Sequence, residues 1–273
     1  MAHTGRVSGP VGRSLEELGE LLLHPAGFRP PVITAVRENL SVLRTAGRLL
    51  PRMPSPTQVD PDRVPVLLVP GFLSGDFALG PMSDQLRRAG HWTGKSGVAP
   101  NIGCTQEVAA IVEARLERAA EHTGRKVAIV GWSRGGTLGR IVTVRRPDLV
   151  AALVTLGTPS TDPLAVNATL AVQLAIITRL HDLGVPGLLG EDCLSGECGR
   201  TVREWLDADV PSEIPYTSVF SMEDGVIDWR ACLDPAARHI EVEATHMSMG
   251  AEPEVIDVVS ALLADVVPVD LAA

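Results

Sequence analysis

The sequence predicts an α/β fold in which helices cover a mostly parallel β-sheet. Short apolar runs alternate with amphipathic segments between residues 64 and 264. The apolar runs are continuous, which is typical of strands buried on both faces of a parallel sheet. One interval, residues 158–214, is far longer than a connection between neighbouring strands requires, so we expect an insertion there.

The expected elements of the core follow one another in a regular order. The apolar runs predict strands at residues 64–70, 126–131, 150–157, 216–221 and 239–244. The amphipathic segments predict helices at residues 81–90, 107–122, 136–146 and 253–264. The helix at residues 253–264 is the last expected element of this alternating order.

Residues 14–50 are expected to form helices before this core begins. Ser14 followed three residues later by Glu17 is a signal for the start of a helix, and apolar residues continue at helical spacing. Arginines interrupt the apolar stripe, so these helices have the alternative of lying on a membrane surface. We favour packing of the stripe against the rest of the protein.

A proline-rich segment separates these helices from the core. Five prolines lie between residues 51 and 65, and proline disfavours both helices and strands. We therefore expect residues 1–60 to be an N-terminal helical extension with its linker, and residues 61–273 to be the main domain. The insertion at 158–214 is expected to form a helical lid on that domain.

The composition narrows the class of protein. A formal net charge of −9 argues against a nucleic-acid binder, because phosphate contacts need a basic face. The N-terminus lacks the basic and then apolar segments of a signal peptide, and no run of about 18 uncharged apolar residues occurs. We therefore expect a cytoplasmic protein whose partner is a small molecule. The sequence carries no signal for the oligomeric state.

The chain has four cysteines, Cys104, Cys193, Cys198 and Cys232. They are too few for a disulfide-framed scaffold, and a cytoplasmic location favours free thiols, with a disulfide as the alternative. The sequence contains no CxxC pair with partnering histidines, the pattern that would indicate a zinc site. We expect neither a metal nor another cofactor.

The segment VAIVGWSRGGTLGR, residues 127–140, places a serine between glycines at the end of an expected strand. A Gly-x-Ser-x-Gly turn presents the serine hydroxyl at the carboxyl end of the sheet, where ligands reach open α/β sheets. Gly131 and Gly135 are expected where a Cβ would collide with a neighbouring strand or helix. Ser133 is the expected nucleophile. The alternative is a solvated serine in a glycine-rich loop. A phosphate-binding P-loop is disfavoured, because this segment has no lysine at the position where a P-loop requires one.

A serine nucleophile needs a base that takes its proton and a carboxylate that orients the base. His239 begins an expected strand, whereas His246 lies in the loop beyond that strand, on the same edge of the sheet as Ser133. We therefore expect His246 to be the base.

The carboxylate is expected at the end of the preceding strand, where Glu223, Asp224 and Asp228 are candidates. Asp224 is favoured, because Gly225 allows a tight turn and the apolar residues after it can pack under the loop. Spacing alone leaves the other two carboxylates open.

Attack on a carbonyl builds negative charge on its oxygen, which needs N–H donors aimed at it. The backbone N–H of Arg134 follows the nucleophile directly and is one expected donor. The second is expected from Phe72, in the loop after the first core strand. The alternative for Phe72 is that its ring only forms a wall of the site.

Five ordered segments resemble the α/β-hydrolase superfamily, and within it the serine lipases and esterases. They are VPVLLVPGFLSGD, VAIVGWSRGG, ALVTLGTPS, YTSVFSMEDGVIDW and HMSMG, and they extend across residues 64–250. The resemblance implies the triad Ser133, Asp224 and His246, with an oxyanion hole from Phe72 and Arg134. A serine at the turn is unlike haloalkane dehalogenases and epoxide hydrolases, which attack with a carboxylate, so ester chemistry is implied.

The expected function is hydrolysis of a small-molecule ester through an acyl-serine intermediate, without a cofactor. Acyl transfer or thioester hydrolysis by the same triad is the alternative, and a non-catalytic binding protein is a further one. The segment NATLAVQLAIITRL is apolar around most of a helix, so it must be covered. We expect it to roof the site, with Leu170, Leu174 and Ile177 binding an apolar acyl group. Burial of this helix against the core is the alternative.

Overall fold

The computed structural model describes residues 28–31, 33, 34, 36–38, 40, 41 and 58–271. Most of the expected N-terminal extension, including the helix start at Ser14 and most of the proline-rich linker, lies outside the described residues. The described positions from 33 to 41 are helical.

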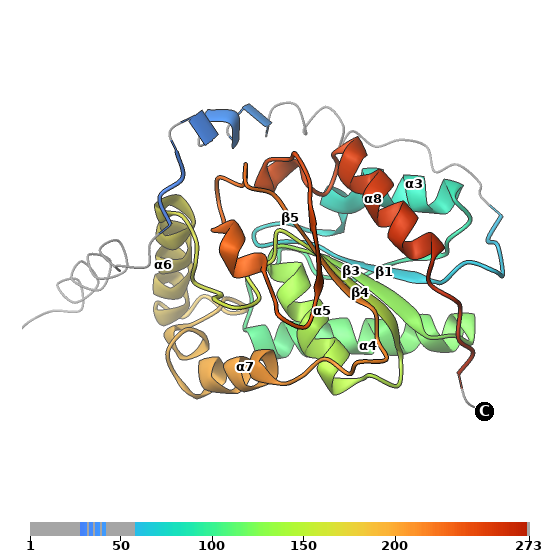
Figure 1. Cartoon of the computed structure of the whole chain (residues 1–273). Coiled ribbons are helices and arrows are strands. Elements are labelled where there is room, and N and C mark those ends of the chain that lie inside the picture. Colours follow the sequence, from blue (N-terminus) through green and yellow to red (C-terminus); the bar gives the residue numbers. More distant parts are fainter. Residues whose placement is uncertain (1–27, 32, 35, 39, 42–57, 272–273) are drawn as a thin grey trace, which may run out of the picture.

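Six strands form a single parallel sheet in the order β2-β1-β3-β4-β5-β6 (Figure 1). The strands are β1 Val66–Val69, β2 Thr93–Lys95, β3 Val127–Trp132, β4 Val150–Leu156, β5 Tyr216–Phe220 and β6 Arg238–Glu241. Every residue of β1, β3 and β5 is buried, as the continuous apolar runs predict. The predicted α/β fold is confirmed.

Helices cover both faces of this sheet. They are α3 Gly80–Arg88, α4 Thr105–Thr123, α5 Arg134–Arg145, α6 Ala168–Asp182, α7 Glu197–Asp207 and α8 Pro253–Ala264. Figure 1 shows α4 and α5 on one face, and α3 with α8 on the other.

Successive strand residues point to opposite faces, so each face has its own apolar core. Leu67 and Ile129 pack in a cluster with residues of α4, α5 and α7. Val66 and Val130, one position away, pack in a second cluster with residues of α3 and α8. Burial of these two clusters holds both helical layers on the sheet.

Two edge strands differ from the sequence-based expectation. Strand β2, with the sequence TGK, was not expected, because a three-residue edge strand with one exposed position leaves no apolar run. Strand β6 was expected over residues 239–244 but ends at Glu241, where the chain leaves the sheet towards the last loop.

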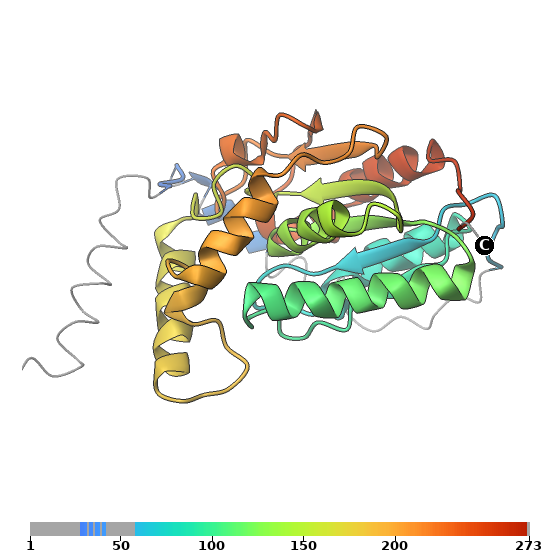
Figure 2. The same cartoon turned by 90° about the horizontal axis from the view of Figure 1, so that it is seen from below.

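The insertion at 158–214 contains α6, α7 and the short helix η2 Glu191–Cys193. Figure 2 shows α6 and α7, in yellow and orange, at the end of the sheet towards which the strands point. Helix α7 contributes Val202 and Leu206 to the core cluster. Helix α6 buries Ala171 and Ile177, but Ile176 remains 52 % exposed, so α6 is covered on one side only among the described residues.

No helix in the described part of the chain combines the length and the apolar character needed to cross a membrane.

Candidate active site

Ser133 occupies a strained turn between β3 and α5. Its φ is 54° and its ψ is −126°, a conformation that non-glycine residues rarely adopt. The turn is held by the Ser133 N–H, which donates to the carbonyl of Leu156 at 2.8 Å. A Cβ on Gly131 would lie 2.5 Å from the Gly135 oxygen, and one on Gly135 would lie 2.1 Å from the Val69 oxygen. The predicted collisions at these two glycines are confirmed.

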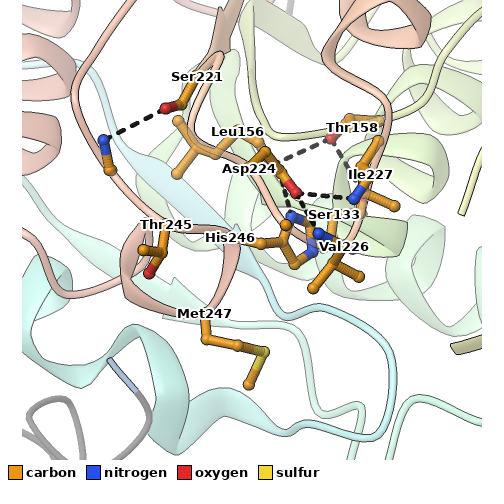
Figure 3. A network of polar contacts seen from close by, with 12 residues as sticks. Ser133, Leu156, Thr158, Ser221, Asp224, Val226, Ile227, Thr245, His246 and Met247 are labelled. Carbon is orange, nitrogen blue, oxygen red and sulfur yellow. Dashed lines mark hydrogen bonds and ion pairs between the residues drawn. The ribbon is translucent and has the colours of Figure 1, made fainter. Parts of the chain in front are cut away.

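The structure brings Ser133, His246 and Asp224 into one hydrogen-bonded chain (Figure 3). The Nε2 atom of His246 lies 3.0 Å from Ser133 Oγ, and its Nδ1 lies 2.6 Å from Asp224 Oδ2. All three residues are buried. Because the carboxylate accepts a hydrogen bond from Nδ1–H, the proton of the neutral imidazole stays on Nδ1 and Nε2 is left free to accept the proton of the serine hydroxyl.

The loop after β5 orients the Asp224 carboxylate. Its Oδ1 accepts the backbone N–H groups of Val226 at 2.8 Å and Ile227 at 2.7 Å. Ile227 is fully buried and packs beside Phe220 and Cys232, which anchors the loop. The second oxygen, Oδ2, is thereby aimed at His246.

The other candidates for acid and base make different contacts. The side chain of Glu223 is half-exposed and forms an ion pair with Arg37. Asp228 caps the short helix η3 Trp229–Cys232 by accepting the N–H of Arg230. His239 contacts the carbonyl of Asp234 at 2.8 Å through Nε2. Among these carboxylates and histidines, only Asp224 and His246 lie in the chain of contacts that reaches Ser133.

The pKa of the His246 imidazole is raised. Burial by itself lowers the pKa, but the charge and hydrogen bond of Asp224, together with the charge of Glu38, raise it more. The indole Nε1 of Trp132 donates to the His246 carbonyl at 3.1 Å, and its ring lies 5.9 Å from the imidazole. These contacts hold the ring in position.

Glu38 is a residue of the site that sequence reasoning missed. Its Oε2 accepts the N–H of Gly225 at 3.1 Å and that of His246 at 3.0 Å, and its Oε1 accepts the N–H of Met247 at 2.6 Å. Burial raises the Glu38 pKa, while the Met247 N–H acts in the opposite direction. One carboxylate from the N-terminal segment thus joins the acid loop to the histidine loop. Its sequence neighbourhood contains no signal for this, since the partners are about two hundred residues away.

The loop after β1 lies against the nucleophile. A Cβ on Gly71 would be 3.2 Å from the Ser133 Cβ. The N–H of Leu73 is engaged, donating to the Asn101 carbonyl at 3.4 Å. Within the described residues, the N–H groups of Phe72 and Arg134 donate to no other group. Both expected oxyanion donors therefore belong to segments beside Ser133 and have free hydrogen-bonding capacity there.

The side chain of Arg134 is partly buried between the turn and the segment before α4. It donates to the carbonyls of Asn101 at 3.0 Å and Gly103 at 2.6 Å and to the hydroxyl of Thr105 at 3.1 Å. Burial lowers the pKa of Arg134 to about 10, and nearby cysteine sulfurs act in the opposite direction. Sequence reasoning considered only the backbone of this residue.

The start of α6 is tied to the acid loop. Asn167 Nδ2 donates to the Gly225 carbonyl at 2.7 Å, and Asn167 Oδ1 caps α6 by accepting the Leu170 N–H at 2.9 Å. Leu170 packs against the cluster that contains Ile227. Leu174 is half-buried and Ile177 buried. The three expected acyl-binding residues thus lie on a helix that starts next to the triad loop.

All four cysteines are free thiols in this structure. Cys104, Cys193 and Cys198 gather in one place, whereas Cys232 is buried in the cluster under the acid loop. Burial, together with the other two thiols, raises the pKa of Cys198 to about 12. That no disulfide forms between these cysteines in solution stays a prediction.

Comparisons with known proteins find one matching family model and similar solved structures. A family model described as alpha/beta hydrolase fold matches residues 82–177. The chain is similar to the Bacillus licheniformis lipase BlEst2 in mature form, at 19 % identity, covering 77 % of this chain and 96 % of that one, with a TM-score of 0.59. It is also similar to the Paleococcus ferrophilus monoacylglycerol lipase, at 15 % identity, covering 74 % and 96 %, with a TM-score of 0.53. No curated protein sequence matches the chain.

Proposed function

We propose that this chain, which belongs to the α/β-hydrolase superfamily, is a serine hydrolase that cleaves carboxylic esters through an acyl-serine intermediate. The observation that carries the proposal is the contact chain from Ser133 Oγ through His246 to Asp224, with distances of 3.0 and 2.6 Å. A serine, a base and a buried carboxylate in that order are the groups that acyl transfer needs. The likeness to two lipases agrees with this chemistry.

In the first half of the reaction, Ser133 Oγ attacks the ester carbonyl carbon while its proton passes to His246 Nε2. The tetrahedral intermediate carries negative charge on the former carbonyl oxygen, which the N–H groups of Phe72 and Arg134 stabilise. As the intermediate collapses, the ester C–O bond breaks and Nε2 protonates the leaving alcohol.

In the second half, water attacks the acyl-serine with His246 Nε2 as its base, and the acid leaves as Ser133 regains its proton. Asp224 stays ionised throughout, because it holds Nδ1–H and stabilises the imidazolium that forms twice per cycle. No cofactor enters these steps.

The acyl group of the substrate is apolar in this proposal. Helix α6 starts at the acid loop, and Leu170, Leu174 and Ile177 recur on it at spacings of four and three residues, which places them on one side. Such a side offers a wall of CH₂ and CH₃ groups to an aliphatic chain. Each methylene buried there adds about 0.8 kcal/mol of binding until the wall ends.

The test is turnover of p-nitrophenyl esters of rising chain length by the wild type, Ser133→Ala and His246→Ala. Each variant is expected to lose nearly all turnover, keeping about 10³–10⁴-fold over water from binding and the oxyanion hole. Ser260→Ala, on helix α8, is the matched control and should retain wild-type rates. Full turnover by Ser133→Ala would contradict the proposal.

The same experiment separates hydrolysis from acyl transfer. With an added alcohol or thiol, a hydrolase still releases mainly the free acid, whereas an acyltransferase diverts the acyl group to the acceptor. A non-catalytic binding protein gives no turnover, and its Ser133 does not react with a phosphonofluoridate.

A further inference from the structure

Three of the four cysteines converge at one point outside the triad. The Sγ atoms of Cys104, Cys193 and Cys198 all lie within 4.8 Å of one another, and those of Cys104 and Cys198 are 3.5 Å apart. They come from three separate segments: the residue that precedes α4, the end of η2, and the first turn of α7. A simple crosslink between two segments needs only two of these sulfurs.

The spacing of the sulfurs matches that of zinc ligands. A Zn–S bond is about 2.3 Å long, which places two sulfurs of a tetrahedral site about 3.8 Å apart. The Cys104–Cys198 sulfur separation, 3.5 Å, and the upper bound for all three pairs, 4.8 Å, lie on either side of that value. The three thiols therefore have the spacing of one face of a coordination tetrahedron, reached with shifts below about 1 Å.

The backbone around the sulfurs is built to hold them together. Asp192 accepts the N–H of Glu197 at 2.8 Å and that of Cys198 at 3.3 Å, which fixes the start of α7 beside η2. A Cβ on Gly196 would lie 1.9 Å from Asp192 Oδ1, so this turn needs glycine. Gln106, two residues after Cys104, reaches the Cys198 carbonyl at 3.5 Å. The ligand residues are thus positioned by contacts independent of any ion.

The charge near the cluster fits a bound zinc ion. The guanidinium of Arg134 lies beside the cluster, because it donates to the Gly103 carbonyl and the Thr105 hydroxyl, on either side of Cys104, and also to the Asn101 carbonyl. Among the described residues it forms no ion pair with a carboxylate. Three thiolates and one Zn²⁺ carry a net charge of −1, which the guanidinium neutralises. A partly buried cation without a carboxylate partner is costly, so this pairing stabilises both the guanidinium and the zinc–thiolate group.

We propose that Cys104, Cys193 and Cys198 bind one Zn²⁺ ion as thiolates, with water as the fourth ligand. Binding releases three thiol protons to solvent and changes no oxidation state. The ion joins the insertion, through η2 and α7, to the start of α4 in the core. It also lies beside the guanidinium of Arg134, the residue that directly follows Ser133 in the chain.

The test measures zinc binding on the full chain. The protein is purified with a non-thiol reductant, freed of metal by a chelator, and titrated with Zn²⁺ against a chromophoric competitor. The wild type is expected to bind one equivalent, and Cys104→Ser, Cys193→Ser and Cys198→Ser are each expected to bind far more weakly. Cys232→Ser is the matched control, because this buried thiol lies outside the cluster, and it should keep one equivalent.

Cobalt gives a second readout that does not depend on activity. Co²⁺ in a tetrahedral thiolate site shows sulfur-to-metal charge-transfer bands and intense visible bands. We expect both in the wild type and in Cys232→Ser, and their loss in the other three variants. Zinc should also raise the melting temperature of the wild type and leave that of the three cluster variants unchanged.

Two outcomes would overturn the proposal. One is a reduced, folded wild type that binds no Zn²⁺. The other is equal binding by the wild type and the three cluster variants. If the reduced chain binds no zinc and the chain purified without reductant, and so exposed to dissolved oxygen as the oxidant, has a mass lower by two hydrogen atoms, the cluster is instead a disulfide between two of these cysteines.

Discussion

At the scale of single residues, the candidate site depends on the strained backbone of Ser133 and on the hydrogen bonds of both carboxylate oxygens of Asp224. Ser133 adopts a strained backbone conformation, in a turn where neighbouring backbone leaves no room for a Cβ on Gly131 or Gly135. Asp224 uses one oxygen for the loop backbone and the other for His246, so its position and its function are coupled.

Asp224→Asn should cost far more activity than Glu223→Gln. The amide introduced by the first substitution would present the wrong hydrogen-bonding partner to Nδ1 and would not stabilise the imidazolium, a loss of about 10⁴ in kcat in a Ser-His-Asp enzyme. The side chain of Glu223 is half-exposed and contacts Arg37 instead, so its replacement should change kcat less than about threefold. Steady-state kinetics of both variants measures this, and the reverse ranking would refute the assignment of Asp224.

Glu38→Gln should shift the pH profile. The His246 imidazole must be neutral to accept the serine proton, so kcat/KM falls as the pH drops through its raised pKa. Glu38 contributes negative charge that raises this pKa, so removing the charge should move the acidic limb to lower pH.

The matched control for Glu38→Gln is Glu254→Gln, an exposed residue at the start of α8. It should leave the acidic limb where it is in the wild type. If Glu38 served only to hold the two loops, its variant would lower kcat/KM at every pH without moving the midpoint, and that result would argue against its electrostatic contribution.

At the scale of elements, buried polar contacts fix how α5 and the strands fit together. Arg140 of α5 pairs with Asp234 at 2.7 Å, with side chains only 6 % and 4 % exposed. Asp234 also accepts a hydrogen bond from the Tyr216 hydroxyl of β5 at 3.3 Å, and Arg140 donates to the Trp205 carbonyl of α7. This network joins three elements in the interior.

Arg140→Met should destabilise the fold by about 3–5 kcal/mol, because it leaves the Asp234 carboxylate buried without its partner. Arg145→Met on the same helix is the control, since Arg145 is 30 % exposed in its pair with Glu113. Its loss should cost at most about 2 kcal/mol, including its contact with Trp205. Urea denaturation of both variants measures the difference, and equal costs would contradict the argument.

Helix α6 should set the preferred ester length. Leu174→Ala with Ile177→Ala removes apolar surface from the side proposed to face the acyl chain, so turnover of long esters should fall while acetate turnover stays near wild type. Ile176→Ala with Leu180→Ala is the control, because those side chains are 52 % and 41 % exposed. An unchanged length profile, or unfolding of the first double variant, would mean that this side of α6 belongs to the core.

At the scale of the whole molecule, the sheet has helices on both faces and the insertion beyond the ends of its strands (Figure 2). Both loops that carry Asp224 and His246 leave the sheet at the same edge as the turn of Ser133. Residues separated by 113 positions in the chain meet there. The proposed zinc site adds a second junction between the insertion and the core.

The sequence by itself determined the fold and the turn of Ser133, because both depend on neighbouring residues. A continuous apolar run indicates a buried strand. Each glycine of the turn stands where a Cβ would collide with backbone of the same turn or of the neighbouring strand. Chain order and loop position also selected His246 and favoured Asp224, whereas Glu223 and Asp228 stayed open until the structure brought Asp224 together with His246 and Ser133.

Only the tertiary structure decided the contacts that join distant segments without a local pattern. Glu38 reaches His246 across 208 positions, and Cys104 meets Cys198 across 94, yet neither residue stands out in its own stretch of sequence. Periodicity reports which way a side chain faces within its element, whereas the partner it meets depends on how the elements pack. For that reason the nucleophile was predictable from a short motif, while the carboxylate behind the triad and the cluster of three thiols became visible only in the folded chain.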